Sequence, residues 1–231
     1  MYERGDLDCV HEPFLYYQYV GLQYRQIPHF KVVADCPVSY EGVRDMLLER
    51  GENRPVFFKD MSFYAMPRIL QDAEFCKRLT NCFLIRNPLA SIPSYHKLDP
   101  GVTLLEIGIE SQWHHFSALE QMLESPPIVI QSEDVRSNAE GALAALWERI
   151  GLDYCPGAFE WGDQHPGDWN KLEGWHVDVS ASSSIRAVGS DEAETEAARF
   201  EQYAARHPHL SAFLTHHNKY YERLKRRALI V

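Results

Sequence analysis

Four short apolar runs, each followed by polar residues, alternate with segments of helical spacing along the first two thirds of the chain. Short apolar runs bounded by turn residues predict buried strands, and longer segments with an apolar residue every three or four positions predict helices. The predicted strands are 7–10, 55–60, 83–86 and 127–131. Strands that alternate with helices in this way predict an α/β fold built on a parallel sheet.

Several segments between and after these strands carry the end signals of helices. Ser39 and Asn138 are residue types that cap helix N-termini, and Gly51 and Gly151 are placed to end the same two helices. Pro93 is expected to kink or break the helix that contains it. The predicted helices are 15–23, 39–51, a helix that starts at 88, 103–123, 138–151 and 191–227.

A chain of 231 residues can bury one sizeable core, so a single domain over residues 1–231 is predicted. Residues 1–155 form its expected α/β core. Residues 156–190, rich in Trp, Gly, His and Ser, are expected to be an irregular lid-like segment, and residues 191–231 the C-terminal helices.

Charge and composition exclude some functions. The net charge of −10 argues against binding of nucleic acids or anionic membranes, although one local anion site is compatible with it. No apolar run is long enough for a transmembrane helix, and no secretory signal is evident. The five scattered cysteines suggest reduced thiols in a cytoplasmic protein. The histidines show no spacing typical of a metal site, so no metal is predicted.

The residues that follow the predicted strands carry the candidate chemistry. They are His11 and Glu12, Lys59 and Asp60, Arg86 and Asn87, and Gln131 to Asp134. Ligands of open α/β sheets bind outside the carboxyl ends of the strands, so these side chains are expected at one binding edge. Ser94 follows Arg86 by eight residues, which would let a fixed positive charge and a hydroxyl hold one phosphate.

Taken in the order in which they occur along the chain, these strand-end segments resemble those of the sulfotransferases that use 3′-phosphoadenylyl sulfate (PAPS). The segment from Arg86-Asn87-Pro88 to Ser94-Tyr95 matches the family's motif for the 3′-phosphate, and residues 57–60 fall where the family has a lysine-bearing strand. Residues 128–135 resemble the family's next strand and turn, and His11-Glu12-Pro13-Phe14 resembles a Glu-Pro step of carbohydrate-type members. The resemblance covers roughly residues 7–155.

The resemblance implies a three-layer, P-loop-type parallel sheet flanked by helices, and an enzyme that moves a sulfuryl group from PAPS to a hydroxyl or amine. The acceptor would be a small molecule or a carbohydrate, the bound nucleotide would be PAPS or 3′,5′-ADP, and a homodimer is left open. Arg86 and Ser94 would bind the cofactor through its 3′-phosphate. Lys59 would neutralise the transferring group, and Glu12 would take the proton of the acceptor.

The sequence departs from that family in two places. Met61 stands where cytosolic members have a histidine, so Glu12 is the favoured base over Asp60 and His11, with orientation of Lys59 as its alternative role. The family's first strand and phosphate loop, which are central in its sheet, have no counterpart here. The two neighbouring strands could close up, another segment could fill the gap, or the chain could be a shortened form of a longer protein that starts at an internal methionine. The last is expected, with an inactive or weak protein as its consequence. The alternatives are a non-catalytic nucleotide-binding relative and another P-loop transferase, such as a small-molecule kinase.

Overall fold

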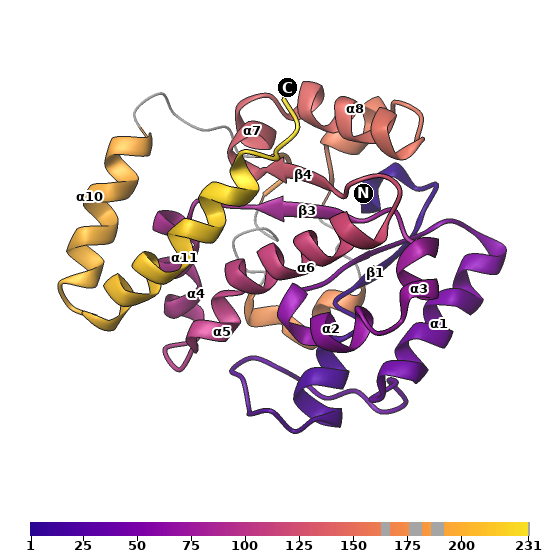
Figure 1. Cartoon of the computed structure of the whole chain (residues 1–231), viewed down its shortest axis with the longest axis horizontal. Coiled ribbons are helices and arrows are strands. Elements are labelled where there is room, and N and C mark those ends of the chain that lie inside the picture. The colour runs from indigo at the N-terminus through magenta and orange to yellow at the C-terminus, as the bar shows by residue number, and fades with distance from the viewer. Residues whose placement is uncertain (163–166, 176–181, 186–191, 231) are drawn as a thin grey trace. The chain divides into compact units, whose positions relative to one another are not determined.

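The structure is a computed structural model that describes residues 1–162, 167–175, 182–185 and 192–230. It divides into two compact units, the first made of Met1–Phe75 with Cys155–Ile185 and the second of Cys76–Tyr154 with Arg186–Val231. The described secondary structure is mostly helical, and its strands are short and parallel (Figure 1). The predicted α/β class with parallel strands is therefore confirmed.

The described strands form two separate sheets of two strands each. β1 (Asp8–His11) pairs in parallel with β2 (Val56–Lys59), and β3 (Cys82–Ile85) pairs in parallel with β4 (Ile128–Gln131). All four lie within one or two residues of their predicted bounds. β2 and β3, which would flank the central strand expected to be missing, do not pair with each other among the described residues.

The main helix of the first unit shows how sequence signals set its ends. α1 (Tyr40–Asn53) begins at Ser39, whose side chain accepts the N–H of Gly42 at 3.1 Å, as predicted. The helix continues through Gly51, so the predicted end there is wrong. It stops at Arg54, which is extended because the proline that follows it disfavours a helical conformation.

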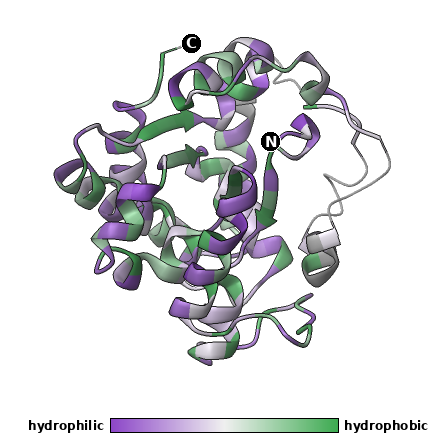
Figure 2. Cartoon of the chain, turned by 90° about the vertical axis from the view of Figure 1, so that its right-hand side faces the viewer, coloured by the Kyte–Doolittle hydropathy of each residue, from purple (hydrophilic) through white to green (hydrophobic). Residues whose placement is uncertain are grey.

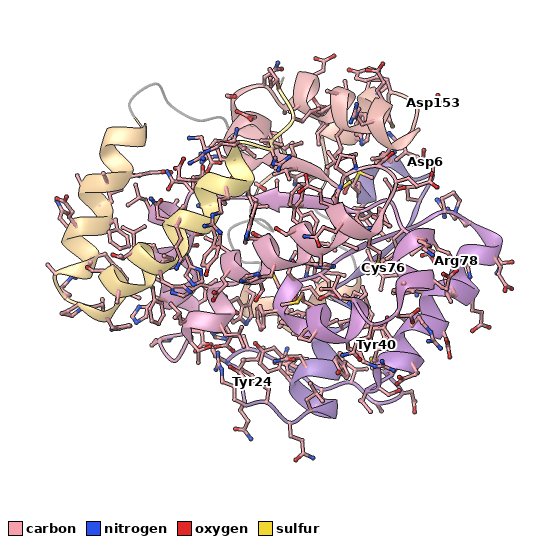
Figure 3. All side chains as sticks on the ribbon, in the orientation of Figure 1. Asp6, Tyr24, Tyr40, Cys76, Arg78 and Asp153 are labelled. Carbon is pink, nitrogen blue, oxygen red and sulfur yellow. The ribbon has the colours of Figure 1, made fainter. Side chains whose placement is uncertain are left out.

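Aromatic side chains pack the first unit. Phe14 stacks on Tyr40 with ring centroids 5.5 Å apart, and both rings are buried; Tyr40 is labelled in Figure 3. The helix predicted at 15–23 is present as a π-helical turn, η2 (Tyr17–Gly21), preceded by two helical residues. The remaining helices here are η1 (Tyr2–Arg4), α2 (Ser62–Ile69), the start of α3 (Ala73–Arg78), η3 (Pro156–Phe159) and η4 (Gly167–Trp175).

Two helices of the second unit differ from their prediction. α4 (Pro88–Leu98) continues through Pro93, because contacts with two neighbouring helices support it despite the lost N–H. The helix predicted at 103–123 is divided into α5 (Leu104–Ile107) and α6 (Ile109–Met122). Gly108 lies between them with a φ of 80°, a left-handed conformation that glycine adopts without strain.

Other ends in this unit follow the prediction. α8 (Ala139–Ile150) is capped by Asn138, whose side chain accepts the N–H of Gly141 at 3.0 Å, and it stops at Gly151. The predicted C-terminal helical region is two helices, α10 (Glu192–Ala204) and α11 (His209–Lys225). α11 lies against α4 and α6 (Figure 1). The remaining helix is α7 (Ser132–Ser137).

The two strands of the second unit consist mostly of apolar residues, which Figure 2 draws in green. Its largest fully buried side chains include Trp147, Phe116 and Leu224. The end of the chain extends the sheet, since Ala228 forms a parallel bridge with Val129 and the N–H of Leu229 donates to the Val129 carbonyl at 2.8 Å. This segment is therefore held to the β4 edge.

The predicted single domain over 1–231, with segments 1–155, 156–190 and 191–231, stays a prediction. Part of segment 156–190 lies outside the described residues. Among the helices that the structure describes, none combines the length and apolar character that crossing a membrane requires.

Candidate functional site

Glu12 and Lys59 meet at the carboxyl end of the β1–β2 sheet, in the first unit. The parallel register places His11 opposite Lys59, and the N–H of Glu12 donates to the Lys59 carbonyl at 2.7 Å. On the other strand, the Asp60 carboxylate accepts the N–H of Phe14 at 2.8 Å. These bonds tie the two strand ends together, so the predicted edge exists for this pair of strands.

The two candidate catalytic side chains form an ion pair. The Lys59 Nζ donates to the Glu12 Oε1. Glu12 is buried, with 6% of its surface exposed, whereas 46% of the Lys59 side chain is exposed. The other carboxylate oxygen of Glu12 accepts the Tyr64 hydroxyl at 3.2 Å, and the His11 imidazole lies 3.8 Å from Oε1. A ligand arriving from solvent would therefore meet the lysine first.

The backbone of Glu12 is strained. Its φ is +46°, in the left-handed region that residues with a Cβ rarely adopt. Such a conformation costs roughly 1–3 kcal/mol and persists only where surrounding contacts impose it. Here the bond from the Glu12 N–H to β2 and the bond from the Leu15 N–H to the Glu12 carbonyl, at 3.2 Å, impose it. Strain of this kind is typical of functional positions.

The carboxyls of Glu12 and Asp60 have pKa values shifted in opposite directions. Burial raises the pKa of Glu12, but the Lys59 charge, the His11 ring and bonds from Lys59 and Tyr64 outweigh it, so the net pKa is lowered. Burial, followed by the negative charge of Glu12, raises the pKa of Asp60 to about 8. Near neutral pH the pair therefore carries about one negative charge, located on Glu12.

Tyr64 is a member of this site that sequence reasoning missed. It lies in the first turn of α2, five positions after Lys59, and side chains there point back towards the helix N-terminus. The spacing of five residues from Lys59 was the signal in the sequence that could have predicted this contact. Tyr19, on η2, packs on Tyr64 with ring centroids 5.7 Å apart.

Arg86 and Ser94 belong to the second unit, whereas Glu12 and Lys59 belong to the first. Arg86 is exposed just after β3, and Ser94 is partly buried on α4. Within the described residues, neither side chain forms a hydrogen bond or an ion pair. Anion binding by these two residues stays a prediction.

A carboxylate already lies at the N-terminus of α4. The Glu133 Oε1 accepts the N–H of Asn87 at 2.8 Å, and Asn87 caps the helix by accepting the N–H of Leu89 at 3.0 Å. A bound phosphate would meet this negative charge at close range, which costs free energy. The local geometry therefore does not favour a phosphate against the helix end itself.

Metal binding has no support in the described part of the chain, where no cluster of three or more His, Cys, Asp or Glu side chains is arranged to hold an ion.

Comparison with known proteins finds two distant relatives, both from Arabidopsis thaliana. The chain is 27% identical to branched-chain-amino-acid aminotransferase-like protein 1 over 189 residues, which are 79% of the chain and 33% of the relative. It is 24% identical to branched-chain-amino-acid aminotransferase-like protein 2 over 163 residues, or 69% of the chain and 28% of the relative. The chain thus spans about a third of each relative. No family model and no solved structure matches.

These relatives overturn the sulfotransferase interpretation. Their names are aminotransferase-like, so the predicted PAPS-dependent sulfuryl transfer is wrong, as are PAPS and 3′,5′-ADP as cofactors. The nucleotide-binding relative and the small-molecule kinase have no support either. The Arg86–Ser94 spacing misled because charged residues end the strands of many α/β proteins, which must emerge into solvent there. The general class of transferase remains consistent with the relatives.

Proposed function

We propose that this chain carries the acid–base centre of a transferase, in which Glu12 and Lys59 act on an amine or hydroxyl of a small-molecule substrate. One observation carries the proposal: a buried carboxylate bonded to a half-exposed lysine, on a strained backbone, at the carboxyl end of a parallel sheet. Ligands of α/β sheets bind at such ends. The three-layer, P-loop-type arrangement stays a proposal about the fold, to be tested by a crystal structure.

The ion pair supplies a way to switch the basicity of Glu12. While Lys59 is bound, its charge stabilises the carboxylate and lowers the Glu12 pKa, which makes Glu12 a weak base. A substrate with a negative group would draw the half-exposed Lys59 towards itself. Glu12 would then stay buried without its cation, in contact with Tyr64 and His11, and its pKa would rise. Substrate binding would thereby create the base.

Asp60 would support this centre as a positioning residue. Its two oxygens accept the N–H groups of Phe14 and Met61, at 2.8 and 3.0 Å, which fixes the turn that carries Glu12. Protonation of Asp60, whose pKa is raised to about 8, keeps a second negative charge away from Glu12 at neutral pH.

The test compares the intact chain with Glu12→Gln, Lys59→Met and a control, Glu52→Gln, which changes an exposed carboxylate on α1. Each is incubated with an extract of small metabolites, and products are followed by mass spectrometry. We expect modified amines or alcohols with the intact chain and the control, and a loss of at least about 100-fold in Glu12→Gln, the scale of general-base catalysis. Identical product profiles for all four proteins would rule the proposal out.

The names of the relatives favour a second candidate, amino-group transfer, which relies on pyridoxal phosphate. That cofactor needs a lysine for covalent attachment and a separate partner at its ring nitrogen. Here the carboxylate is bonded to the lysine itself, so the amine that the cofactor would need is already engaged and the carboxylate is not a separate partner. The described residues therefore do not fit that cofactor at Lys59.

Reduction with borohydride in the presence of pyridoxal phosphate distinguishes the two candidates. We expect mass spectrometry to find no cofactor attached to Lys59, and no amino transfer from L-leucine to 2-oxoglutarate. Attachment at Lys59, abolished in Lys59→Arg together with amino transfer, would replace the first candidate with the second.

A further inference from the structure

Three histidines of the second unit meet where the turn between α10 and α11 lies against the end of α4 (Figure 1). His96 is in the last turn of α4, His207 is in the turn, and His209 is the first residue of α11. The ring centroid of His96 lies 4.5 Å from that of His207 and 5.2 Å from that of His209, and the other two lie 6.5 Å apart. We call these three imidazoles the histidine cluster.

Tyr203 joins α10 to the histidine cluster. Its hydroxyl lies 2.9 Å from Nδ1 of His96, and its ring centroid lies 4.7 Å from that of His207. A tyrosine hydroxyl can donate to a neutral imidazole or accept from a charged one, so the bond itself is compatible with both protonation states. Nearer the start of α10, Glu196 accepts a hydrogen bond from Nδ2 of Asn87 at 3.3 Å. Polar contacts therefore hold α10 to α4 and its cap residue at two separate places.

The three imidazoles differ in their access to water. His96 is 4% exposed, whereas His207 is half-buried and His209 is exposed. Water can therefore stabilise a positive charge on His209 far better than one on His96. Burial, followed by the charges of His207 and His209, lowers the pKa of His96, and the nearby Asp99 opposes this shift. The buried ring is therefore mostly neutral at pH 7.

Permanent positive charges lie beside the histidine cluster. The Lys97 ammonium lies 5.4 Å from the Tyr203 ring centroid, and the Arg206 guanidinium lies 5.8 Å from it. Asp99, which is 3% exposed, supplies negative charge from the end of α4. Ionisable side chains of the other helices that contact α4 have partners of their own, namely Glu106 of α5 with Thr103 and His217 of α11 with the Leu104 carbonyl. Protonation of the cluster therefore adds positive charge beside two existing cations.

We propose that the histidine cluster is a pH-sensitive latch that holds the end of α10 on α4. While the imidazoles are neutral, they pack against one another and α10 stays in place. When the pH falls through the range in which imidazoles titrate, the charged rings repel one another and the neighbouring cations, and this end of α10 leaves α4. The contact between Glu196 and Asn87 retains the start of the helix, so the opening is local. The proposal does not rest on the Glu12–Lys59 centre, which lies in the other unit.

Opening of the latch changes the proton affinity of His96. In the open state His96 reaches water, and its pKa returns from the lowered value towards its ordinary value of 6.5. The open state therefore binds more protons, so opening is favoured as the pH falls below 6.5. A proton on His209 acts in the same direction, because the helix dipole opposes a cation in the first turn of α11.

Peptide-resolved hydrogen exchange on the full chain at pH 7.5 and pH 5.5, corrected for intrinsic exchange rates, tests the latch. α8 reports the response of the unit as a whole, because it lies outside the cluster. We expect protection of residues 197–206 to fall between the two pH values at least tenfold more than protection of α8, since one linked proton changes an equilibrium about tenfold per pH unit.

Three variants assign this loss to the cluster. His96→Gln keeps a polar partner for Tyr203 but cannot take up a proton, so the excess loss should shrink to less than threefold. His209→Lys places a permanent charge in the cluster and should lower protection of residues 197–206 at least threefold already at pH 7.5. His114→Gln is the matched control, because His114 is an exposed imidazole on α6 that lies 3.8 Å from the Glu110 carboxylate. It should behave like the intact chain.

Three results would each overturn the proposal. The first is equal loss of protection in α8 and in residues 197–206 of the intact chain, which would mean that the unit opens as a whole. The second is an excess loss that persists in His96→Gln. The third is unchanged protection in His209→Lys at pH 7.5, which remains decisive even where His96→Gln does not fold.

Discussion

The two units differ in which ionisable groups have shifted pKa values. In the unit that contains β1 and β2, two carboxyls beside Lys59 at the strand ends are shifted. In the unit that contains β3 and β4, three helical histidines are shifted. Burial lowers the pKa of His115 and of His217 to about 4, and that of His96 is lowered by burial and by His207 and His209. Neither ring nitrogen of His115 has a partner within the described residues. One unit therefore retains a proton on a carboxyl, and the other excludes protons from its histidines.

This difference gives the two units opposite responses to pH. Asp60 has a pKa of about 8 in the folded state and 3.8 as its ordinary value, so it stabilises the first unit at low pH and loses that contribution as pH rises towards 8. His115 and His217 change from an ordinary pKa of 6.5 to about 4. They contribute no penalty above pH 6.5, and they destabilise the second unit as pH falls towards 4.

The largest expected effect is therefore a pH-dependent exchange of stability between the units. One unit of pKa difference corresponds to about 1.4 kcal/mol, so the two histidines should cost the second unit roughly 3–6 kcal/mol between pH 7 and pH 4. Hydrogen exchange resolved by peptide should show α6 and α11 losing protection over that range. After correction for intrinsic exchange rates, β1 and β2 should keep or gain protection.

Asp60→Asn provides the control for that experiment. It should remove the loss of protection of β1 and β2 between pH 4 and pH 8, and leave α6 and α11 unchanged. Parallel loss of protection in both units as the pH falls would show that they unfold together, and the comparison would then be invalid.

Removal of the lysine should have the next largest effect. Lys59→Met leaves the buried Glu12 carboxylate without its cation, and loss of one partner of a fully buried pair costs about 3–5 kcal/mol. Because Lys59 is half exposed, we expect a smaller loss, about 1–3 kcal/mol at pH 7. Carbon-13 NMR of the Glu12 carboxyl should show its pKa rising above the ordinary value of 4.5. An unchanged pKa would mean that Lys59 does not control the charge of Glu12.

His115→Phe should have a moderate effect in the opposite direction. The ring keeps its edge-on packing against Phe83, with centroids 5.3 Å apart, and no hydrogen bond to a described residue is lost. Protonation no longer destabilises the unit, so stability at pH 5 should increase by about 1–2 kcal/mol, and by less at pH 7.5. Chemical denaturation at the two pH values measures this. An equal change in the free energy of unfolding at both pH values would show that the effect comes from packing alone.

The cap substitutions should have the smallest effects. Ser39→Ala in the first unit and Asn138→Ala in the second each remove one side-chain acceptor from a helix N-terminus. Each should cost about 1 kcal/mol. Hydrogen exchange should confine the first effect to α1 and its neighbours and the second to α8. A cap lost in one unit that lowers protection in both would indicate a single cooperative unit.

Local features of the fold could be predicted from the sequence, whereas non-local ones could not. The apolar runs at β1 to β4 and the capping residues Ser39 and Asn138 depend on a few neighbours along the chain. The division into two sheets depends on which strands pair, which is set by distant segments. Pro93 was expected to disturb α4, but tertiary contacts with α10 and α11 override that preference.

The candidate site shows the same limit. Position alone identified Glu12 and Lys59 at adjacent strand ends, because parallel strands place their carboxyl ends at one edge. The hydroxyl of Tyr64 and the raised pKa of Asp60 depend on packing and burial, which the sequence does not display. The family resemblance rested on a few positions around Arg86, while the comparison with the aminotransferase-like relatives weighs most of the chain.

The left-handed φ of Glu12 places two demands on one position. The backbone there is least strained with glycine or asparagine, whereas the ion pair with Lys59 needs a carboxylate. A saturation library at this position should therefore rank differently under two selections. When the library is selected for resistance to proteolysis, Gly and Asn should be enriched relative to the other substitutions. When it is selected for the activity of the chain, only Glu should be retained. Residue 12 would then be a position where selection for activity opposes selection for stability.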